Sequence, residues 1–171
     1  MDKPFWLFND STDEYTSYIY EIIGKALMIC TRFESYCKHL ELLLNIKTGL
    51  ASGEDVLSEF NLRRLSDEIY NKRLFDNIRK LSLEKDSNDL LIDAKNIRNE
   101  IVHEITKGID DPELPTEVFS RLEEDLKKKI EKILYAEYQL VAAVCIITNE
   151  HIPNDNYITN NLKWVFYEEH L

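Results

Sequence analysis

The sequence predicts an all-α protein in which two long helices bracket shorter ones and an aromatic tail follows. Glycine and proline, which interrupt helices, occur only four times each among the 171 residues. Apolar residues recur at spacings of three and four through long segments, as on the buried stripe of an amphipathic helix. Few β-branched runs alternate with polar residues as a strand would require. Residues 1–171 have the length of a single domain.

The first predicted helix begins at a capping-box pattern, Ser11-x-x-Glu14, and extends to about Lys47. Gly49 and Gly53 then end it. Nine apolar residues form its stripe over four heptads, as expected for a helix packed along its whole length. They are Tyr15, Ile19, Ile22, Ala26, Ile29, Phe33, Tyr36, Leu40 and Leu43.

Shorter helices are predicted in the middle of the chain, from Glu54 to near Lys72 and from Arg73 to Lys85. The run Asp86-Ser87-Asn88-Asp89 supplies an N-cap and acidic first-turn residues for the next helix, from Ser87 to about Thr106. The apolar stripe of that helix contains Leu90, Ala94, Ile97, Ile101 and Ile105.

Gly108–Pro115 is the clearest break in the sequence, since its two prolines forbid a continuous helix. The last long helix is predicted from Thr116 to about Glu150. Its apolar positions are Phe119, Leu122, Leu126, Ile130, Ile133, Leu140, Val144 and Ile147. After the turn-rich residues 153–156, the aromatic tail (Leu162, Trp164, Val165, Phe166 and Tyr167) is expected to pack on its own domain. A tail that binds a partner is the alternative.

Cysteine usage and hydropathy exclude several classes of protein. Cys30, Cys37 and Cys145 are odd in number and lack metal-type spacing, which argues against a disulfide framework and a zinc site and favours small core residues. Residues 1–4 show neither a basic n-region nor an apolar h-region. The longest apolar run, Leu140–Ile147, falls far short of the ~20 residues that span a bilayer. We therefore expect a cytoplasmic protein without a membrane partner.

The candidate functional residues lie in the run Arg98-Asn99-Glu100-Ile101-Val102-His103. At about 100° per residue, Asn99 and His103 project nearly opposite Ile101, and Arg98 lies on the flank. Asn99 and His103 are four residues apart and therefore neighbours. An ordinary solvated helix face is the alternative interpretation of these polar side chains.

Arg98-Asn99-x-x-x-His103 in an all-helical chain of this size resembles the RNxxxH motif of the HEPN superfamily, many of whose members are ribonucleases that need no metal. The resemblance implies a HEPN-like up-and-down bundle of four to five helices that pairs by two-fold symmetry. Two copies of the motif helix then face each other across a cleft where RNA is cut. It also implies a role in a toxin–antitoxin or antiviral defence system, with an antitoxin or regulatory protein as partner. No cofactor is expected.

The resemblance implies that Arg98, Asn99 and His103 are catalytic. The ribose 2′-hydroxyl attacks the adjacent phosphate, so the protein has to move protons and stabilise charge. Histidine exchanges a proton near neutral pH, and the Arg98 fork matches phosphate oxygens. Asn99 hydrogen-bonds the phosphate or fixes the imidazole. One His103 would act as base while its symmetry mate protonates the leaving 5′-oxygen, giving a 2′,3′-cyclic phosphate and a 5′-hydroxyl.

The net charge of −11 has the wrong sign for long-range attraction of RNA. Residues 63–98, however, contain nine basic and seven acidic side chains, so this segment carries +2 and the rest −13. The weaker candidates for RNA binding lie here: Arg63, Arg64, Arg73, Arg79, Lys95 and Asn96. An ordinary solvated surface is the alternative for each of them.

The acidity of the chain and the residue at position 105 each limit what the resemblance implies. The acidity of the chain favours a non-catalytic HEPN-like homodimer that binds a partner, a nucleotide or RNA without cutting it. Some toxins of the superfamily are silenced by adenylylation of a tyrosine two residues after the histidine, a place that Ile105 occupies here. The resemblance therefore gives that mode of silencing no support.

Overall fold

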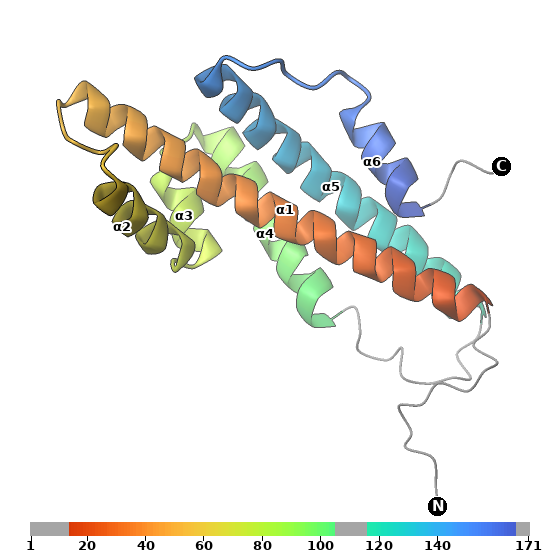
Figure 1. The fold of residues 1–171 in the computed structure, drawn as a ribbon. Helices are drawn as coiled ribbons and strands as arrows, with labels where there is room; N and C mark the ends of the chain where they lie inside the picture. The colour runs from red at the N-terminus through yellow and green to blue at the C-terminus, as the bar shows by residue number, and fades with distance from the viewer. Residues whose placement is uncertain (1–13, 105–115, 167–171) are drawn as a thin grey trace, which may run out of the picture.

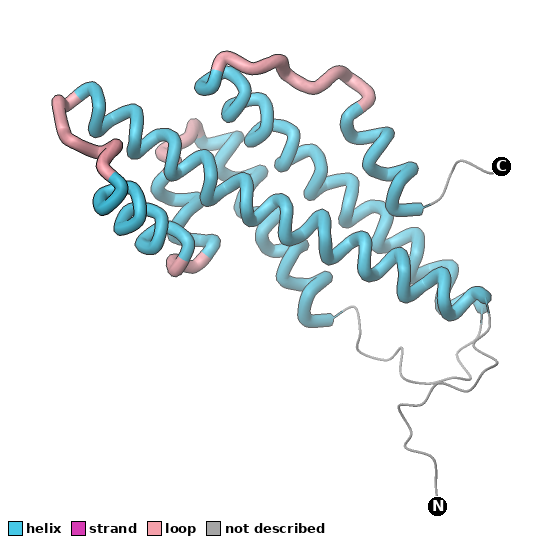
Figure 2. Tube along the Cα trace, in the orientation of Figure 1, coloured by secondary structure: helices cyan, strands magenta, loops and turns pink. Residues whose placement is uncertain are grey.

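The computed structural model describes residues 14–104 and 116–166, and over these ranges every regular element is a helix (Figures 1 and 2). The all-α prediction is thus confirmed. The six helices are α1 (Glu14–Ala51), α2 (Glu59–Tyr70), α3 (Leu74–Lys80), α4 (Lys85–Glu104), α5 (Thr116–Thr148) and α6 (Tyr157–Phe166). The predicted capping serine Ser11, the Gly108–Pro115 break, Ile105 and Tyr167 lie outside the described residues.

The long helices α1 and α5 run parallel to each other, and α4 and α6 run the opposite way (Figure 1). Tyr18 on α1 donates to Glu123 on α5, and Arg32 donates to Glu137, so both sequences advance together. Glu100 on α4, by contrast, pairs with Lys129 on α5. Since Asp93 pairs with Lys132, α4 is antiparallel to α5. In chain order α1, α4, α5 and α6 therefore alternate in direction, with α2 and α3 inserted after α1 (Figure 1).

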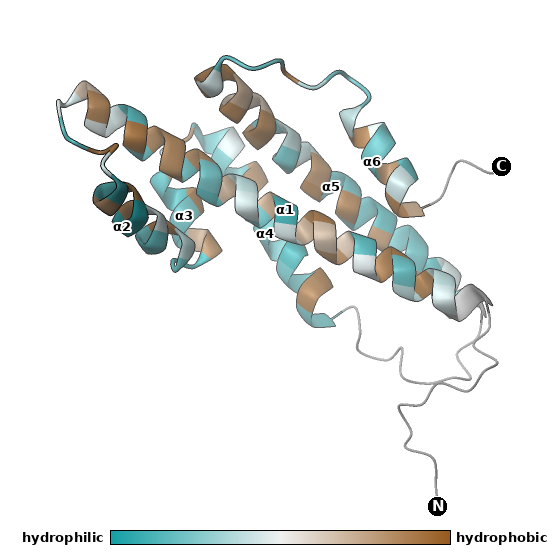
Figure 3. Cartoon of the chain, viewed as in Figure 1, coloured by the Kyte–Doolittle hydropathy of each residue, from teal (hydrophilic) through white to brown (hydrophobic). Residues whose placement is uncertain are grey.

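The core forms where the predicted apolar stripes meet, and Figure 3 shows apolar residues along α1 and α5 against a largely hydrophilic α2. Ile29 and Phe33 on α1 are fully buried, as are Ile130 and Ile133 on α5. The three cysteines are buried and free, as predicted. Burial raises the pKa of the Cys30 thiol to about 12, which leaves it a poor nucleophile.

The helix count exceeds the predicted four to five because the aromatic tail itself contains a helix. Val165 and Phe166 of α6 are buried, whereas Trp164 is 42 % exposed. The tail therefore packs on its own domain, as expected. A polar group also holds it, since Tyr157 on α6 and Arg32 on α1 both donate to the buried carboxylate of Glu137.

Four helix boundaries were predicted wrongly. The fourth helix begins at Lys85 rather than Ser87, so the predicted N-cap residues 86–87 already lie within it. The second helix begins at Glu59 rather than Glu54, because Ser58 is its N-cap and accepts from the amide of Asn61. The third ends at Lys80 rather than Lys85, because Ser82 has a positive φ of 50°. The first continues to Ala51, beyond the predicted Lys47.

The prediction that Gly49 ends the first helix is wrong, because Gly49 lies inside α1. A loop crosses close to it. A Cβ added at Gly49 would collide with Cγ1 of Val56, in the segment between α1 and α2. A Cβ added at Gly24, on the same helix, would meet nothing within 4 Å.

We expect opposite effects from the same substitution at these two glycines. Gly24→Ala should raise the free energy of unfolding by about 0.5–1 kcal/mol through helix propensity. Gly49→Ala should lower it by about 1 kcal/mol, because overpacking against the stiff Val56 exceeds that gain. Urea denaturation of both variants measures this. An equal gain at both sites would show that the loop moves away freely.

Candidate functional site

Arg98, Asn99 and His103 lie in the second half of α4 (Lys85–Glu104). The helix is fixed from within by Leu91, Ala94, Ile97 and Ile101, all of which are buried. Asn99 is half-buried, and His103, one turn further on, is exposed. The predicted geometry is thus confirmed for these residues, with Ile101 inward and Asn99 and His103 away from the core.

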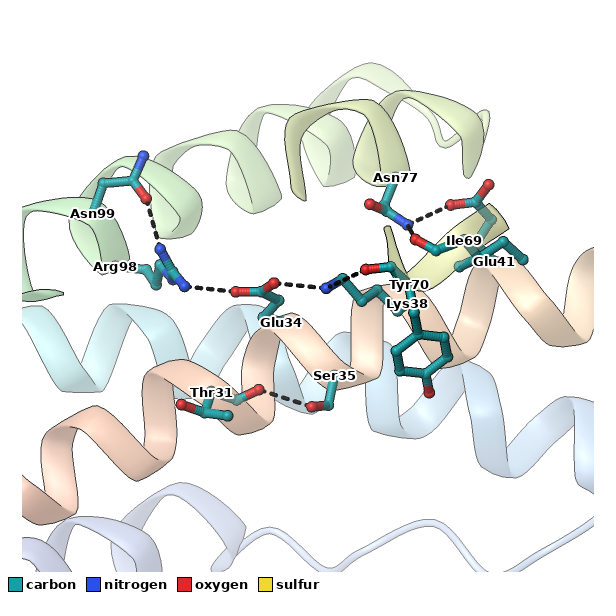
Figure 4. A network of polar contacts seen from close by, with 10 residues as sticks. All are labelled: Thr31, Glu34, Ser35, Lys38, Glu41, Ile69, Tyr70, Asn77, Arg98 and Asn99. Carbon is teal, nitrogen blue, oxygen red and sulfur yellow. Dashed lines mark hydrogen bonds and ion pairs between the residues drawn. The ribbon is translucent and has the colours of Figure 1, made fainter. Parts of the chain in front are cut away.

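Arg98 points toward α1 rather than into open solvent. Its Nη2 donates to Oε2 of Glu34 at 2.6 Å, and its Nη1 donates to Oδ1 of Asn99 at 3.1 Å (Figure 4). Its side chain remains 24 % exposed. Each Nη carries a second N–H, so an anion that reaches the exposed edge of the guanidinium still finds donors.

Glu34 connects Arg98 to a second cation. Lys38, one turn further along α1, donates to Oε1 of Glu34 at 2.8 Å and to the Tyr70 carbonyl at 3.3 Å. Burial by itself would raise the pKa of Glu34. The hydrogen bonds and positive charges of Lys38 and Arg98 outweigh that effect, and the net result is a pKa below its usual value. Glu34 is therefore a carboxylate held between two cations.

The ion pair with Glu34 gives Arg98 a defined position, but this position costs free energy of folding. The Nε of Arg98 is buried and has no hydrogen-bond partner among the described residues. A buried donor without a partner costs about 1–3 kcal/mol. Among the described contacts, the guanidinium is therefore held by its two Nη groups alone. This geometry orients Arg98, but the unpaired Nε offsets part of the free energy of folding that these contacts contribute.

Asn99 contacts Arg98 and not the imidazole. Because its Oδ1 accepts from Arg98, the Nδ2 group points away from the guanidinium (Figure 4). Its two N–H donors face outward from α4 and are suited to an anionic oxygen. Asn99 therefore orients Arg98, a role that was not predicted for it, and its contact with a phosphate stays a prediction.

Glu34 and Lys38 were missed by the sequence analysis. Their signal was a set of charges, Glu34, Lys38 and Glu41, spaced by four and three along the edge of an apolar stripe. On a fully exposed helix such charges pair with one another. On a helix packed from end to end such charges also pair with residues of neighbouring segments. Glu41 does so, accepting from Asn77 at 2.8 Å and pairing with Lys72 at 3.1 Å.

The six weaker candidates divide into two groups. Arg79, Lys95 and Asn96 are brought together, since the Arg79 and Lys95 cations both lie near the ring of Phe75, and Lys95 donates to Asn96 at 2.8 Å. The second group, Arg63, Arg64 and Arg73, is exposed on α2 and at the N-cap of α3, and no contact joins it to the first.

Two further charges near the candidate residues have acidic or basic neighbours. Glu100, within the motif, pairs with Lys129 of its own chain at 3.4 Å. Arg64 lines a hollow of about 160 Å³ that Glu54 and Asp55 also line, so two carboxylates share its surroundings. Arg64 is consequently the least suited of the six to bind a phosphate.

No group of three His, Cys, Asp or Glu side chains able to hold a metal ion occurs in residues 14–104 and 116–166. None of the helices in these ranges is long and apolar enough to cross a bilayer. Comparison of the chain with protein-family models, curated proteins and solved structures finds no match. The residues of the site alone therefore carry the functional interpretation.

Acid should weaken the Glu34 bridge in a defined direction. A lowered pKa in the folded state means that the carboxylate stabilises the fold above about 4.5, its ordinary value, and that this contribution disappears as the pH falls through the folded pKa. Near neutral pH, Glu34→Gln should lower the free energy of unfolding by about 1–2 kcal/mol. Below the folded pKa, wild type and variant should converge.

Urea denaturation across this pH range measures the difference between the two proteins. Glu124→Gln is the matched control, because Glu124 also has a pKa lowered by a lysine, Lys128, yet is fully exposed. The control should have a smaller effect near neutral pH. Equal effects of the two substitutions would contradict a special role of the bridge between α1 and α4.

Proposed function

We propose that this chain is a HEPN-type endoribonuclease that cuts RNA without a metal ion at the cleft of a homodimer. The observation that carries this proposal is the arrangement on α4. Arg98 is oriented by Glu34 at 2.6 Å and by Asn99 at 3.1 Å, and the exposed His103 follows one turn later. The three groups are an imidazole that exchanges protons, a permanent cation and an amide donor, and all three suit cleavage by a 2′-hydroxyl.

In this mechanism each side chain has one task. His103 of one subunit takes the proton of the 2′-hydroxyl as that oxygen bonds to phosphorus. The bond from phosphorus to the 5′-oxygen breaks, and His103 of the other subunit gives this oxygen a proton. Arg98 and the Nδ2 group of Asn99 stabilise the charge on the phosphoryl oxygens. The products are a 2′,3′-cyclic phosphate and a 5′-hydroxyl.

The role of Glu34 in this mechanism is positioning. An unpaired arginine side chain samples many rotamers, and ordering it during the reaction costs conformational entropy. The short contact with Glu34 fixes Arg98 beforehand, which favours preorganised stabilisation of the transition state. We place the reaction in a toxin–antitoxin or antiviral defence system, in which a second protein restrains it.

A non-catalytic, homodimeric binding module is the second candidate, and two observations favour it. The net charge of −11 opposes RNA binding. The Glu34–Arg98 contact also gives Arg98 a structural use, as a bridge between α1 and α4. A module of this kind would need Arg98 for stability and would have no need of His103.

His103→Ala and Arg98→Ala should each lower the rate of RNA cleavage in EDTA by at least about 100-fold, since general acid–base catalysis contributes that much for His103 and stabilisation of the transition-state charge contributes that much for Arg98. The assay follows total RNA on a gel and labels the new 5′-hydroxyl ends with a kinase. His151→Ala, an exposed histidine between α5 and α6, is the control and should cut at the wild-type rate. If all four proteins behave alike, the enzyme proposal is wrong.

Activity should also depend on pairing, because each cleft needs two His103 side chains. We expect the specific activity to fall as the protein is diluted through the dissociation constant of the dimer, which sedimentation measures independently. Full activity in a preparation shown to be monomeric would exclude the shared cleft.

A further inference from the structure

Phe75 is an exposed aromatic residue with cations beside it on two helices. It lies on α3 and is 42 % exposed. The guanidinium carbon of Arg79, one turn along the same helix, lies 5.8 Å from the ring centroid, and Nζ of Lys95 on α4 lies 5.5 Å from it. Both distances lie in the range of cation–π contacts, and the exposed fraction of Phe75 leaves part of the ring accessible to a ligand.

The helix that carries Phe75 is held rigidly. Ile78 and Asn77 of α3 are fully buried, and Asn77 donates to the Glu41 carboxylate at 2.8 Å and to the Ile69 carbonyl at 3.0 Å. A short helix fastened in this way presents its outer side chains in a fixed orientation. Phe75 is therefore a preorganised surface and not a mobile loop residue.

Lys95 connects this aromatic surface to the motif. On the helical wheel of α4, Lys95, Asn99 and His103 fall within about 80° of one another on the side away from the core. Lys95 and His103 are eight residues apart, which corresponds to about 12 Å along the helix axis. A strand of RNA with its scissile phosphate at His103 spans that distance with a few nucleotides.

An acidic protein has to hold RNA by short-range contacts. With a net charge of −11, long-range attraction is unfavourable. A base stacked on an aromatic ring gains affinity that does not depend on net charge, and a lysine and an arginine beside the ring can pair with the flanking phosphates. Such stacking needs an unpaired base, because the bases of a duplex are already stacked.

We infer that Phe75, Arg79 and Lys95 form a stacking site for an unpaired base of single-stranded RNA, a few nucleotides from the bond that is cut. This inference rests on the proposed function for its position in the reaction. The stacking itself depends only on the ring and its two cations. The site tolerates different bases, since every base offers a π-face.

Binding can be measured apart from cleavage in full-length protein carrying His103→Ala. Fluorescence anisotropy with a labelled single-stranded RNA of mixed sequence is the readout. In this background Phe75→Ala should weaken binding by about tenfold, the loss expected for one stacked base, and Phe75→Trp should restore it. Phe60→Ala, which removes another exposed ring on α2, should change nothing. The same sequence as a duplex should bind more weakly than the single strand.

The outcomes separate this inference from the proposed function. If Phe75→Ala and Phe60→Ala bind RNA equally well, the stacking site is wrong, even if wild-type protein cuts RNA. If wild-type protein binds through Phe75 and cuts nothing, the stacking site stands and the enzyme proposal fails. Absence of any RNA binding overturns both. Circular dichroism of each variant verifies that the fold is retained.

Discussion

Among the described helices, α1 contacts each of the other five, and the arrangement of the whole bundle depends on this one helix. Its 38 residues have to provide apolar positions for the core and polar positions for its neighbours at the same time. Phe33 enters the core, while Glu34, the next residue, turns toward α4 and holds Arg98. The position of the candidate site is thus set by a residue 64 positions away in sequence.

Glu34 and Glu137 each accept a hydrogen bond from an arginine, but their pKa values shift in opposite directions because they differ in burial. Glu34 keeps partial access to water and has two cationic partners, so its pKa is lowered. Glu137 is fully buried, and burial raises its pKa even though Tyr157 and Arg32 donate to it. Its Oε2 has no partner within the described chain. Glu137 therefore secures the position of α6 at a cost in desolvation, whereas Glu34 stabilises the contact that it makes.

The spacing of apolar residues predicted the helices well, because an amphipathic helix can be recognised from its own sequence, without knowledge of its neighbours. The stripes of α1, α4 and α5 lie in the core at nearly every position whose side chain is described. Boundaries such as Glu59 depended on a single cap or a single backbone angle, which spacing does not reveal. The contact between Glu34 and Arg98 was beyond prediction, because it depends on how two helices are placed in space. The grouping of Phe75 with Lys95 was hidden for the same reason.

The parallel course of α1 and α5 has an electrostatic consequence along the axis of the bundle. Each helix carries a macrodipole, positive at its first residues and negative at its last. Two parallel long helices would add their fields, but α4 and α6 run oppositely and offset them. The Tyr18 hydroxyl, one turn into α1, donates to the Phe166 carbonyl at the end of α6, so the negative end of α6 lies beside the N-terminal part of α1. An approaching polyanion therefore meets a field that is set mainly by side chains and only weakly by the peptide backbone.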